Sequence, residues 1–429
     1  MFCFTNAAAE ALFSNLVLIG ITSFMFNFDW ARPTPEIIRA NFTDPWEWEA
    51  ADGFKVNQLG HPYQGSIYFN AGRANGFSFY ESFGFTALGS FTWEAFGEGQ
   101  HAAINDFITT TIAAAPLGEM LHRLYLEADA AGVPAPLTFL ISPMDGFNRL
   151  ITGKHRYPAG GKLQAFSLTA GFGASSAAFS TSSGVAENIY SFYGPAAHVG
   201  LNVVYGDPFT QSSPVPYEHF EAAVSFGLNP GRYLDARVTS DGYLFSFSPD
   251  TTHALSTGLT LHYDFFSLGE FRMDDSTIDY FGTALDWTVK YHRALDHDWS
   301  AEVKAHAGST FFGVSNYYAP DTAEATRKNY GGGVNTKLSF SLMHPKQGAF
   351  SLGLLGFCLW TYPGTSRLSS GTASWLFIDA AYTRPISPHV SLGLSTSFAA
   401  EIASYTASGT IPATKKHANC LTLVMTWSL

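Results

Sequence analysis

Between residues 61 and 119 the sequence carries an imidazole and several carboxylates within segments made largely of Phe, Ala, Gly, Ile and Thr. Ionisable groups are costly to bury unless they are paired or hydrogen bonded, so their presence in such surroundings needs a reason. A histidine beside carboxylates can act as a general acid or base, and it can also bind a metal ion. The candidate catalytic residues are therefore His61, Glu94, Asp106 and Glu119.

A structural interpretation of these residues competes with the catalytic one, and we favour it. The sequence contains no nucleophile elbow, HExxH motif, paired CxxC motif or phosphate-binding loop. Ser66 and Ser90 could serve as nucleophiles near His61, but both lie in predicted helices, where serine usually packs. Buried hydrogen bonds and ion pairs would instead fix the register of packed helices. We expect no cofactor and no metal ion, and a polar cluster that consists of His61, Asn70, Arg73, Glu94, Asn105, Asp106, Glu119 and Arg123.

Four segments predict the helices that would position this cluster: 8–28, 62–74, 78–96 and 103–128. The first has about the twenty residues that a bilayer-spanning helix needs, but Asn15 and several small residues suit a packed helix equally well. Pro62 fits the first turn of the second. The sequence predicts an aromatic, acidic linker before the second helix, over 41–52, and a Pro/Gly-rich connector after the fourth, over 129–159.

The segment 103–128 would gather polar residues on one helical face. Asn105, Thr109, Glu119 and Arg123 share that face, with apolar residues around them. Pro116 lacks a backbone N–H and should kink the helix about one turn before Glu119.

From about residue 160 the hydrophobic period changes from helical to two, as in strands. In the last such segment, Leu421, Leu423 and Met425 alternate with smaller or polar residues. Short turns alternate with longer loops near 266–277, 314–327, 362–371 and 404–416, as in outer-membrane β-barrels. We predict an antiparallel transmembrane barrel of about twelve strands, near 160–173, 194–206, 217–229, 232–248, 251–265, 278–292, 297–313, 328–343, 347–361, 372–384, 387–403 and 417–429.

Composition agrees with a membrane barrel. Only 14% of the 429 residues are charged, against about 25% in ordinary globular proteins, while 16% are aromatic and 40 are glycine. The mean hydropathy of +0.04 is too polar for a bundle of membrane helices. The formal net charge of −12 argues against a nucleic-acid partner, because phosphate binding requires a basic face. No standard signal peptide is visible, so we expect either that the start at Met1 is misassigned or that the leader of an exported barrel lies upstream of it.

The N-terminal part resembles a bacterial envelope family, the domain-of-unknown-function family numbered 3943. The resemblance rests on a His-Pro-Tyr-x-Gly-x-x-Tyr-x-Asn-x-x-Arg-x-x-Gly pattern over 61–76 and on Gly-Ser-x-x-Trp-Glu over 89–94. Ile-Asn-Asp at 104–106, Leu-Gly-Glu at 117–119 and the run 148–153 reinforce it. Together these motifs cover residues 8 to 155. The resemblance implies an exported outer-membrane protein and supplies no activity.

The strand faces that would line the barrel lumen carry charges of both signs. They predict a salt-bridge network, with a structural role favoured over a selectivity lining or a docking surface for the helical domain. Its expected members are His262, Asp264, Asp286, Lys290, His292, Glu302, Lys304, His306 and Lys337.

These observations predict an α+β membrane protein: a helical domain over 1–155 and an outer-membrane β-barrel over 156–429. The favoured function is small-solute passage or envelope maintenance by a porin-like monomer. Its helical domain would plug the lumen or cap the periplasmic mouth, and its partners would be outer-membrane lipid and the barrel-assembly machinery. One alternative is a lipid-modifying hydrolase or acyltransferase that uses His61 and a carboxylate. Another is a structural scaffold for envelope proteins.

Overall fold

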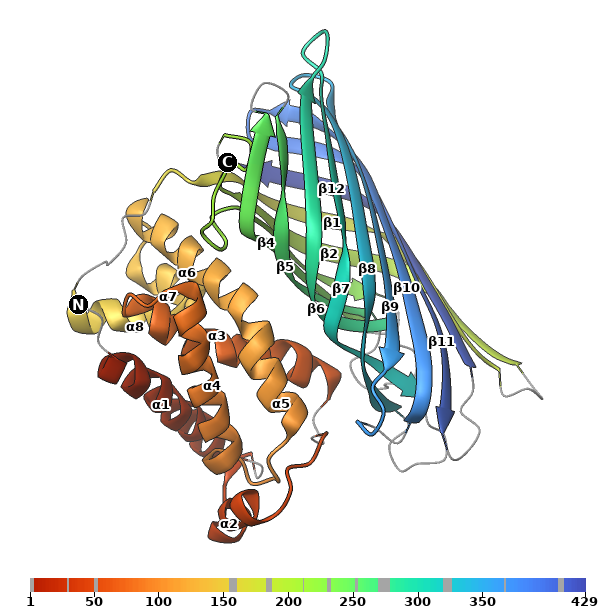
Figure 1. The fold of residues 1–429 in the computed structure, drawn as a ribbon. Coiled ribbons are helices and arrows are strands. Elements are labelled where there is room, and N and C mark those ends of the chain that lie inside the picture. The colour runs from red at the N-terminus through yellow and green to blue at the C-terminus, as the bar shows by residue number, and fades with distance from the viewer. Residues whose placement is uncertain are drawn as a thin grey trace. The chain divides into compact units, whose positions relative to one another are not determined.

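The chain forms two compact units, Met1–Lys162 and Leu163–Leu429, in a computed structural model. Figure 1 shows the helices of the first unit and the strands of the second. The structure describes residues 4–28, 31–49, 53–153, 160–182, 187–210, 212–229, 233–250, 254–268, 278–318, 326–365, 368–407 and 413–429.

The first unit is helical. It contains α1 (Phe4–Gly20), α2 (Pro35–Thr43), α3 (His61–Ala74), α4 (Phe79–Phe96), α5 (Ile104–Ile108), α6 (Ala114–Ala130), α7 (Ala135–Ile141) and α8 (Pro143–Thr152). Within the described residues, π-helical turns adjoin these helices at η1 (Ile21–Met25), η3 (Val56–Gly60) and η4 (Thr109–Ala113). Among the helices that the structure describes, Phe4–Met25 is the segment long and apolar enough to cross a membrane.

The predicted helices 62–74 and 78–96 correspond to α3 and α4. The predicted helix 103–128 is interrupted, because η4 lies between α5 and α6. Pro116 explains the interruption, since its ring removes one donor and crowds the carbonyl of residue 112 in the preceding turn.

Two stretches predicted as irregular contain helices. The prediction of an irregular connector over 129–159 was wrong, since this stretch includes α7 and α8. Its residues 154–159 lie outside the described part. The linker 41–52 overlaps the end of α2. Local signals for α2 and α8 are present: Thr34 caps α2 by accepting a hydrogen bond from the Ile37 N–H, and Pro143 occupies the first turn of α8.

Helix α3 is the centre of the helical unit, packing against α1, α4, α6 and α8. Gly65 permits the close approach of the chain that leads into α6. A Cβ added there would lie 2.0 Å from the Thr110 carbonyl oxygen. Farther along, a Cβ on Gly118 would lie 2.8 Å from the Phe69 ring. The helices therefore cross at a distance that a side chain at residue 65 would not allow.

The second unit is a closed antiparallel barrel in which each strand pairs with its sequence neighbours and β1 pairs with β12. The predicted fold class and strand number are confirmed. The strands are β1 (Leu163–Ser182), β2 (Glu187–Tyr205), β3 (Phe220–Asn229), β4 (Tyr233–Asp250), β5 (Leu255–Leu268), β6 (Ile278–Ala294), β7 (Ser300–Tyr318), β8 (Thr326–His344), β9 (Gly348–Thr361), β10 (Leu368–Ser387), β11 (Val390–Ala407) and β12 (Ala413–Ser428).

Several strands extend into the stretches predicted as long loops. For example, β7 continues to Tyr318 and β11 to Ala407. Much of the predicted loops 266–277, 314–327 and 404–416 lies outside the described residues. An even number of strands places the start of β1 and the end of β12 at the same end of the barrel.

The outer face of the barrel is apolar, as lipid contact requires. On β12, Leu421, Leu423 and Met425 are 57%, 66% and 51% exposed. Between them, Thr422 and Val424 point inward and are buried. The predicted alternation on β12 therefore separates a lipid-facing surface from the lumen.

Candidate functional site

The predicted polar cluster is buried in the helical unit but divides into separate networks. His61, Glu94, Asn105 and Asp106 belong to the first, between α3, α4 and α5. His61 Nε2 lies 3.9 Å from Asp106 Oδ2. The other ring nitrogen, Nδ1, lies 3.2 Å from the Thr110 hydroxyl. The Asn105 amide donates to Asp106 Oδ1 at 2.7 Å.

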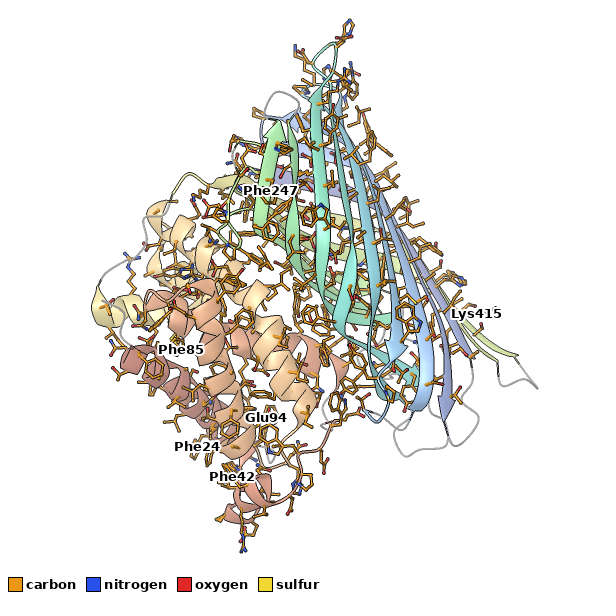
Figure 2. All side chains as sticks on the ribbon, in the orientation of Figure 1. Phe24, Phe42, Phe85, Glu94, Phe247 and Lys415 are labelled. Carbon is orange, nitrogen blue, oxygen red and sulfur yellow. The ribbon has the colours of Figure 1, made fainter. Side chains whose placement is uncertain are left out.

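Glu94, labelled in Figure 2, faces this network from α4. Its Oε2 accepts a 2.9 Å hydrogen bond from the Ala103 N–H, just before α5 begins. Burial raises the pKa of the Glu94 carboxyl well above its ordinary value, and the negative charges of Glu98 and Asp106 raise it further. Its Oε1 makes no hydrogen bond within the described residues. A protonated, neutral Glu94 fits these surroundings.

Glu119 lies in a second network with Arg73 and Arg123. Arg73 donates from Nε to Oε2 at 2.6 Å and from Nη2 to Oε1 at 3.0 Å, which is a bidentate pair. Arg123 Nε donates to Oε1 at 2.8 Å. Burial by itself would raise the pKa of Glu119, but the two guanidinium groups outweigh it and leave this pKa lowered. A carboxylate held ionised in this way ties α3 to α6 and is poorly suited to proton transfer.

Asn70 joins a third network that the sequence did not indicate. Its amide donates to the Ser142 hydroxyl at 3.0 Å, and Ser142 donates to Asp145 Oδ2 at 2.6 Å. Asp145 Oδ1 lies 2.7 Å from His122 Nδ1. The carboxylate therefore stands between the hydroxyl and the imidazole, whereas activation of a serine requires the imidazole in the middle. Three of these four residues escaped prediction because two lie in the supposed connector and His122 lies off the predicted polar face.

A fourth polar contact attaches α1 to the rest of the unit. Glu10 accepts hydrogen bonds from the Asn75 amide at 2.6 Å and from the Asn148 amide at 2.8 Å. A carboxylate in an otherwise apolar helix was the available signal for this contact.

The two serines considered as nucleophiles bond to backbone carbonyls. Ser66 donates to the Tyr63 carbonyl at 2.6 Å, and Ser90 donates to the Phe107 carbonyl at 3.4 Å. Both are buried. Their positions fit a packing role.

The helical unit contains an apolar cavity of about 580 Å³. This volume is in the usual range for small-molecule sites. From the predicted polar cluster, His61 lines this cavity. Gln64 and Glu98, which were not part of that cluster, also line it. The apolar lining includes Phe13, Val17, Leu18, Ile21, Ile67, Trp93, Met144 and Phe147.

In the barrel, the nine predicted lumen residues form one connected network. Lys337 Nζ lies 2.8 Å from Asp241 Oδ1 and 2.7 Å from Asp264 Oδ1. Lys304 and Lys290 lie 2.7 Å and 2.9 Å from the two carboxylate oxygens of Glu221. Further ion pairs connect the remaining predicted residues, which are His262, Asp286, His292, Glu302 and His306.

Glu221 and Asp241 are central to this network and were missed by the sequence analysis. Glu221 lies on β3 and Asp241 on β4. Both stand at lumen-facing positions, so the period-two pattern of their strands could have identified them.

Two further contacts cross the lumen. Phe266 on β5 stacks on Phe377 on β10, with ring centroids 4.3 Å apart. These strands are five positions apart around the barrel, so the rings meet from nearly opposite walls. Tyr280 stacks in the same layer on Phe357, at 4.1 Å, and packs against Trp375. This aromatic layer, whose rings belong to one apolar cluster, fills part of the lumen near the β5–β6 and β9–β10 connections.

Beside the aromatic layer lies a polar cavity of about 530 Å³. Phe266 lines this cavity as well as the layer. Arg237 on β4 and Asp379 on β10 reach across it to form a 3.0 Å ion pair. Its remaining polar lining includes Ser167, Thr169, His198, Asn202, Ser395, Ser397, Thr422 and Thr426.

The chain is similar to one protein family and to several solved structures. Residues 45–143 match the family model described as Domain of unknown function (DUF3943), which confirms the resemblance found in the sequence. No curated protein matches the chain.

Solved structures similar to the chain include an outer membrane protease, an outer membrane channel and a toluene transporter. The outer membrane protease OmpT from Escherichia coli is 6% identical, with 62% of this chain and 97% of that chain covered and a TM-score of 0.26. An outer membrane channel from Pseudomonas putida F1 is 10% identical, with 62% and 96% covered and a TM-score of 0.31. The P. putida toluene transporter TodX is 9% identical, with 62% and 90% covered and a TM-score of 0.22.

Proposed function

We propose that this chain, a twelve-strand outer-membrane-type barrel with an N-terminal helical domain that matches DUF3943, passes a small solute through a lumen that its own side chains keep narrow. In this proposal the helical domain plugs the lumen or caps the periplasmic mouth, and the barrel opens fully only when both the helical domain and the side-chain contacts in the lumen are moved aside.

The observation that carries the proposal is a polar lumen cavity that is bordered and crossed by contacts between opposite walls. The cavity of about 530 Å³ could hold a small solute, and its wall offers hydroxyl, amide, imidazole and charged groups. Phe266 and Phe377 meet at one side of it, and the Arg237–Asp379 pair crosses it. Such contacts can separate without breaking any strand pairing, which is what a gate requires.

Conductance in planar lipid bilayers tests this proposal. We expect the full chain to be silent and the barrel without residues 1–155 to conduct weakly. The same truncated barrel carrying Phe266→Ala and Phe377→Ala should conduct strongly, because the aromatic layer has been trimmed. Phe172→Ala, at a lipid-facing position that is 68% exposed, is the matched control and should change nothing. A trimmed and truncated barrel that inserts correctly but stays silent would refute solute passage.

One specific observation favours a second candidate, a role in lipid binding or modification. The helical domain has an apolar cavity of about 580 Å³, and His61 lines it with Asp106 3.9 Å behind the imidazole. An acyl chain fits such a cavity, with its polar end near His61, Gln64 and Glu98. A modifying enzyme also needs a nucleophile or an activated water, and the hydroxyl beside His61 Nδ1 is that of the buried Thr110.

Lipid profiles of cells that carry the wild type or His61→Ala distinguish this second candidate. A changed profile is expected if His61 acts on lipid, and identical profiles exclude the modifying enzyme. A scaffold for envelope proteins would be favoured if neither conductance nor lipid composition responds.

A further inference from the structure

Three lumen side chains on consecutive strands converge with the geometry of a metal site. His262 on β5, Asp286 on β6 and His306 on β7 each offer one ligand atom, and these atoms lie within 4.8 Å of one another. His262 Nε2 is 3.4 Å from Asp286 Oδ2. Two ligands of a tetrahedral ion with bonds of about 2.1 Å lie about 3.4 Å apart, so this pair already has the required spacing. All three side chains are buried.

Two ligand-type atoms in this group are buried without a hydrogen-bond partner in the described part of the chain. They are Nε2 of His306 and Oδ1 of Asp286. His306 is 3% exposed and Asp286 is 0% exposed, so bulk water does not solvate these atoms. Buried polar atoms normally have partners; a bound cation would supply one to His306 Nε2, and also to Asp286 Oδ1 when the carboxylate binds it through both oxygens.

The surrounding residues orient the two imidazoles as in known metal sites. His262 Nδ1 lies 2.5 Å from Asp241 Oδ1, so a proton held there leaves the lone pair of Nε2 directed to the other side. His306 Nδ1 contacts the Thr288 hydroxyl at 2.7 Å, which likewise leaves Nε2 available. Asn335 donates to Asp286 Oδ2 at 2.5 Å and fixes the carboxylate. The Thr260 hydroxyl, 2.7 Å from His262 Nε2, is the group that an ion would displace.

The charge of the network also suits a divalent cation. Five carboxylates (Glu221, Asp241, Asp264, Asp286 and Glu302) face three ammonium groups (Lys290, Lys304 and Lys337), which leaves two negative charges when all five carboxylates are ionised and the three histidines His262, His292 and His306 are neutral. Lys337 Nζ lies 2.8 Å from His262 Nδ1, but not beside the proposed ligand atom Nε2, and Asp241 and Asp264 neutralise it. A doubly charged cation balances the remaining charge.

We propose that His262, Asp286 and His306 bind a divalent metal ion of the zinc type inside the barrel, cross-linking β5, β6 and β7. Two imidazoles and one carboxylate are ligands that Zn²⁺ prefers, and a water would complete the coordination. No metal-ligand spacing is visible in the sequence, because the three ligands come from separate strands and meet only through the sheet register.

The test is zinc binding to the full chain, refolded in detergent, stripped with chelator and titrated with ZnSO₄. We expect about one Zn²⁺ per chain by metal analysis, and a Co²⁺-substituted sample with the absorption bands of a tetrahedral site. His306→Gln and Asp286→Asn should each lose the bound ion. His198→Gln, a lumen histidine that lines the polar cavity, should retain it.

Heat-modifiable gel mobility establishes that each variant forms a barrel, and only folded variants enter the comparison. The proposal is overturned if the wild type binds no zinc. It is overturned equally if folded His306→Gln binds as much zinc as the wild type, since the ion would then be held elsewhere.

Discussion

Two buried glutamates of the helical domain show how surroundings decide what the same side chain does. Glu119 is held between two guanidinium groups, 2.6 Å from Arg73 Nε and 2.8 Å from Arg123 Nε, and its pKa is lowered. Glu94 has no comparable cation, and burial beside Glu98 and Asp106 raises its pKa. The first stabilises the fold as an anion, whereas the second does so as a neutral acid. Removing the partner of a buried ion such as Glu119 costs about 3–5 kcal/mol.

Glu94→Gln should make the helical domain more stable at neutral pH. It should also make the free energy of unfolding depend less on pH between 4.5 and the raised pKa of Glu94. The folded pKa of Glu94 is raised, so its favourable contribution is complete below the ordinary value of 4.5 and is lost as pH rises through the raised pKa. Across that window the wild type loses up to about 1.4 kcal/mol per pH unit relative to the variant. Glutamine cannot ionise, and its amide oxygen can still accept from the Ala103 N–H.

Urea unfolding of the full chain, followed by helical circular dichroism at several pH values, measures this difference. Glu36→Gln, an exposed glutamate in the first turn of α2, serves as the control and should follow the wild type. A gap between Glu94→Gln and wild type that stays constant from pH 4 to neutrality would contradict a raised pKa.

Residue types alone predicted that these polar groups are buried, but not which of them bond to one another. Asn70 and Arg73 are close in sequence, yet Asn70 bonds to Ser142 and Arg73 to Glu119. The choice of partner depends on how each helix is rotated about its axis. Pro116 and the π-helical turn η4 shift that rotation in the middle of the predicted polar face.

At the scale of elements, the helical domain depends on how closely its other helices approach α3. Gly65 lies where the backbone of η4 crosses α3, and an added Cβ there would lie 2.0 Å from the Thr110 carbonyl oxygen and 2.6 Å from the Ala114 Cβ. The obstacle is mostly backbone, which cannot rotate away as a side chain can.

Gly65→Ala should therefore destabilise the helical domain by about 1–3 kcal/mol or more, since the helices must separate to admit the methyl group. Gly84→Ala on α4 is the matched control, because nothing lies within 4 Å of a Cβ at that exposed position. There the better helix propensity of alanine should stabilise the domain by about 0.5–1 kcal/mol. Urea midpoints that shift equally for both variants would show that the α3 crossing is not tight.

A helix or strand could be predicted when its hydrophobic periodicity persisted over enough residues. The strands were found because period-two alternation persists over many residues, as from Val390 to Phe398. Helix α3 was found because Pro62 and a long apolar run mark it. Helices α7 and α8 are 7 and 10 residues long, too short for a clear period, and their prolines resembled loop signals.

For the whole molecule, the apolar outer face and the polar lumen determine where the barrel is stable. Neighbouring residues of one strand face two different solvents. Leu421 on β12 is 57% exposed on the outside. Cys420, next to it, lines the polar cavity together with Asp235 and Asp379. Sequence alternation predicted these two faces, whereas the cross-lumen contacts depend on the closed register and could not be predicted.

Leu421→Arg should impair folding into a membrane, and Cys420→Arg should not. Residue 421 is near the middle of β12, where an outward arginine at the bilayer midplane costs about 2–4 kcal/mol. At residue 420 the same guanidinium enters the lumen cavity, which has room for water and is lined by the carboxylates of Asp235 and Asp379. The folded fraction after refolding into lipid vesicles, read from heat-modifiable gel mobility, should fall for the first variant alone. Equal yields for both would mean that lipid does not surround this face, and the outer-membrane placement of the barrel would then be wrong.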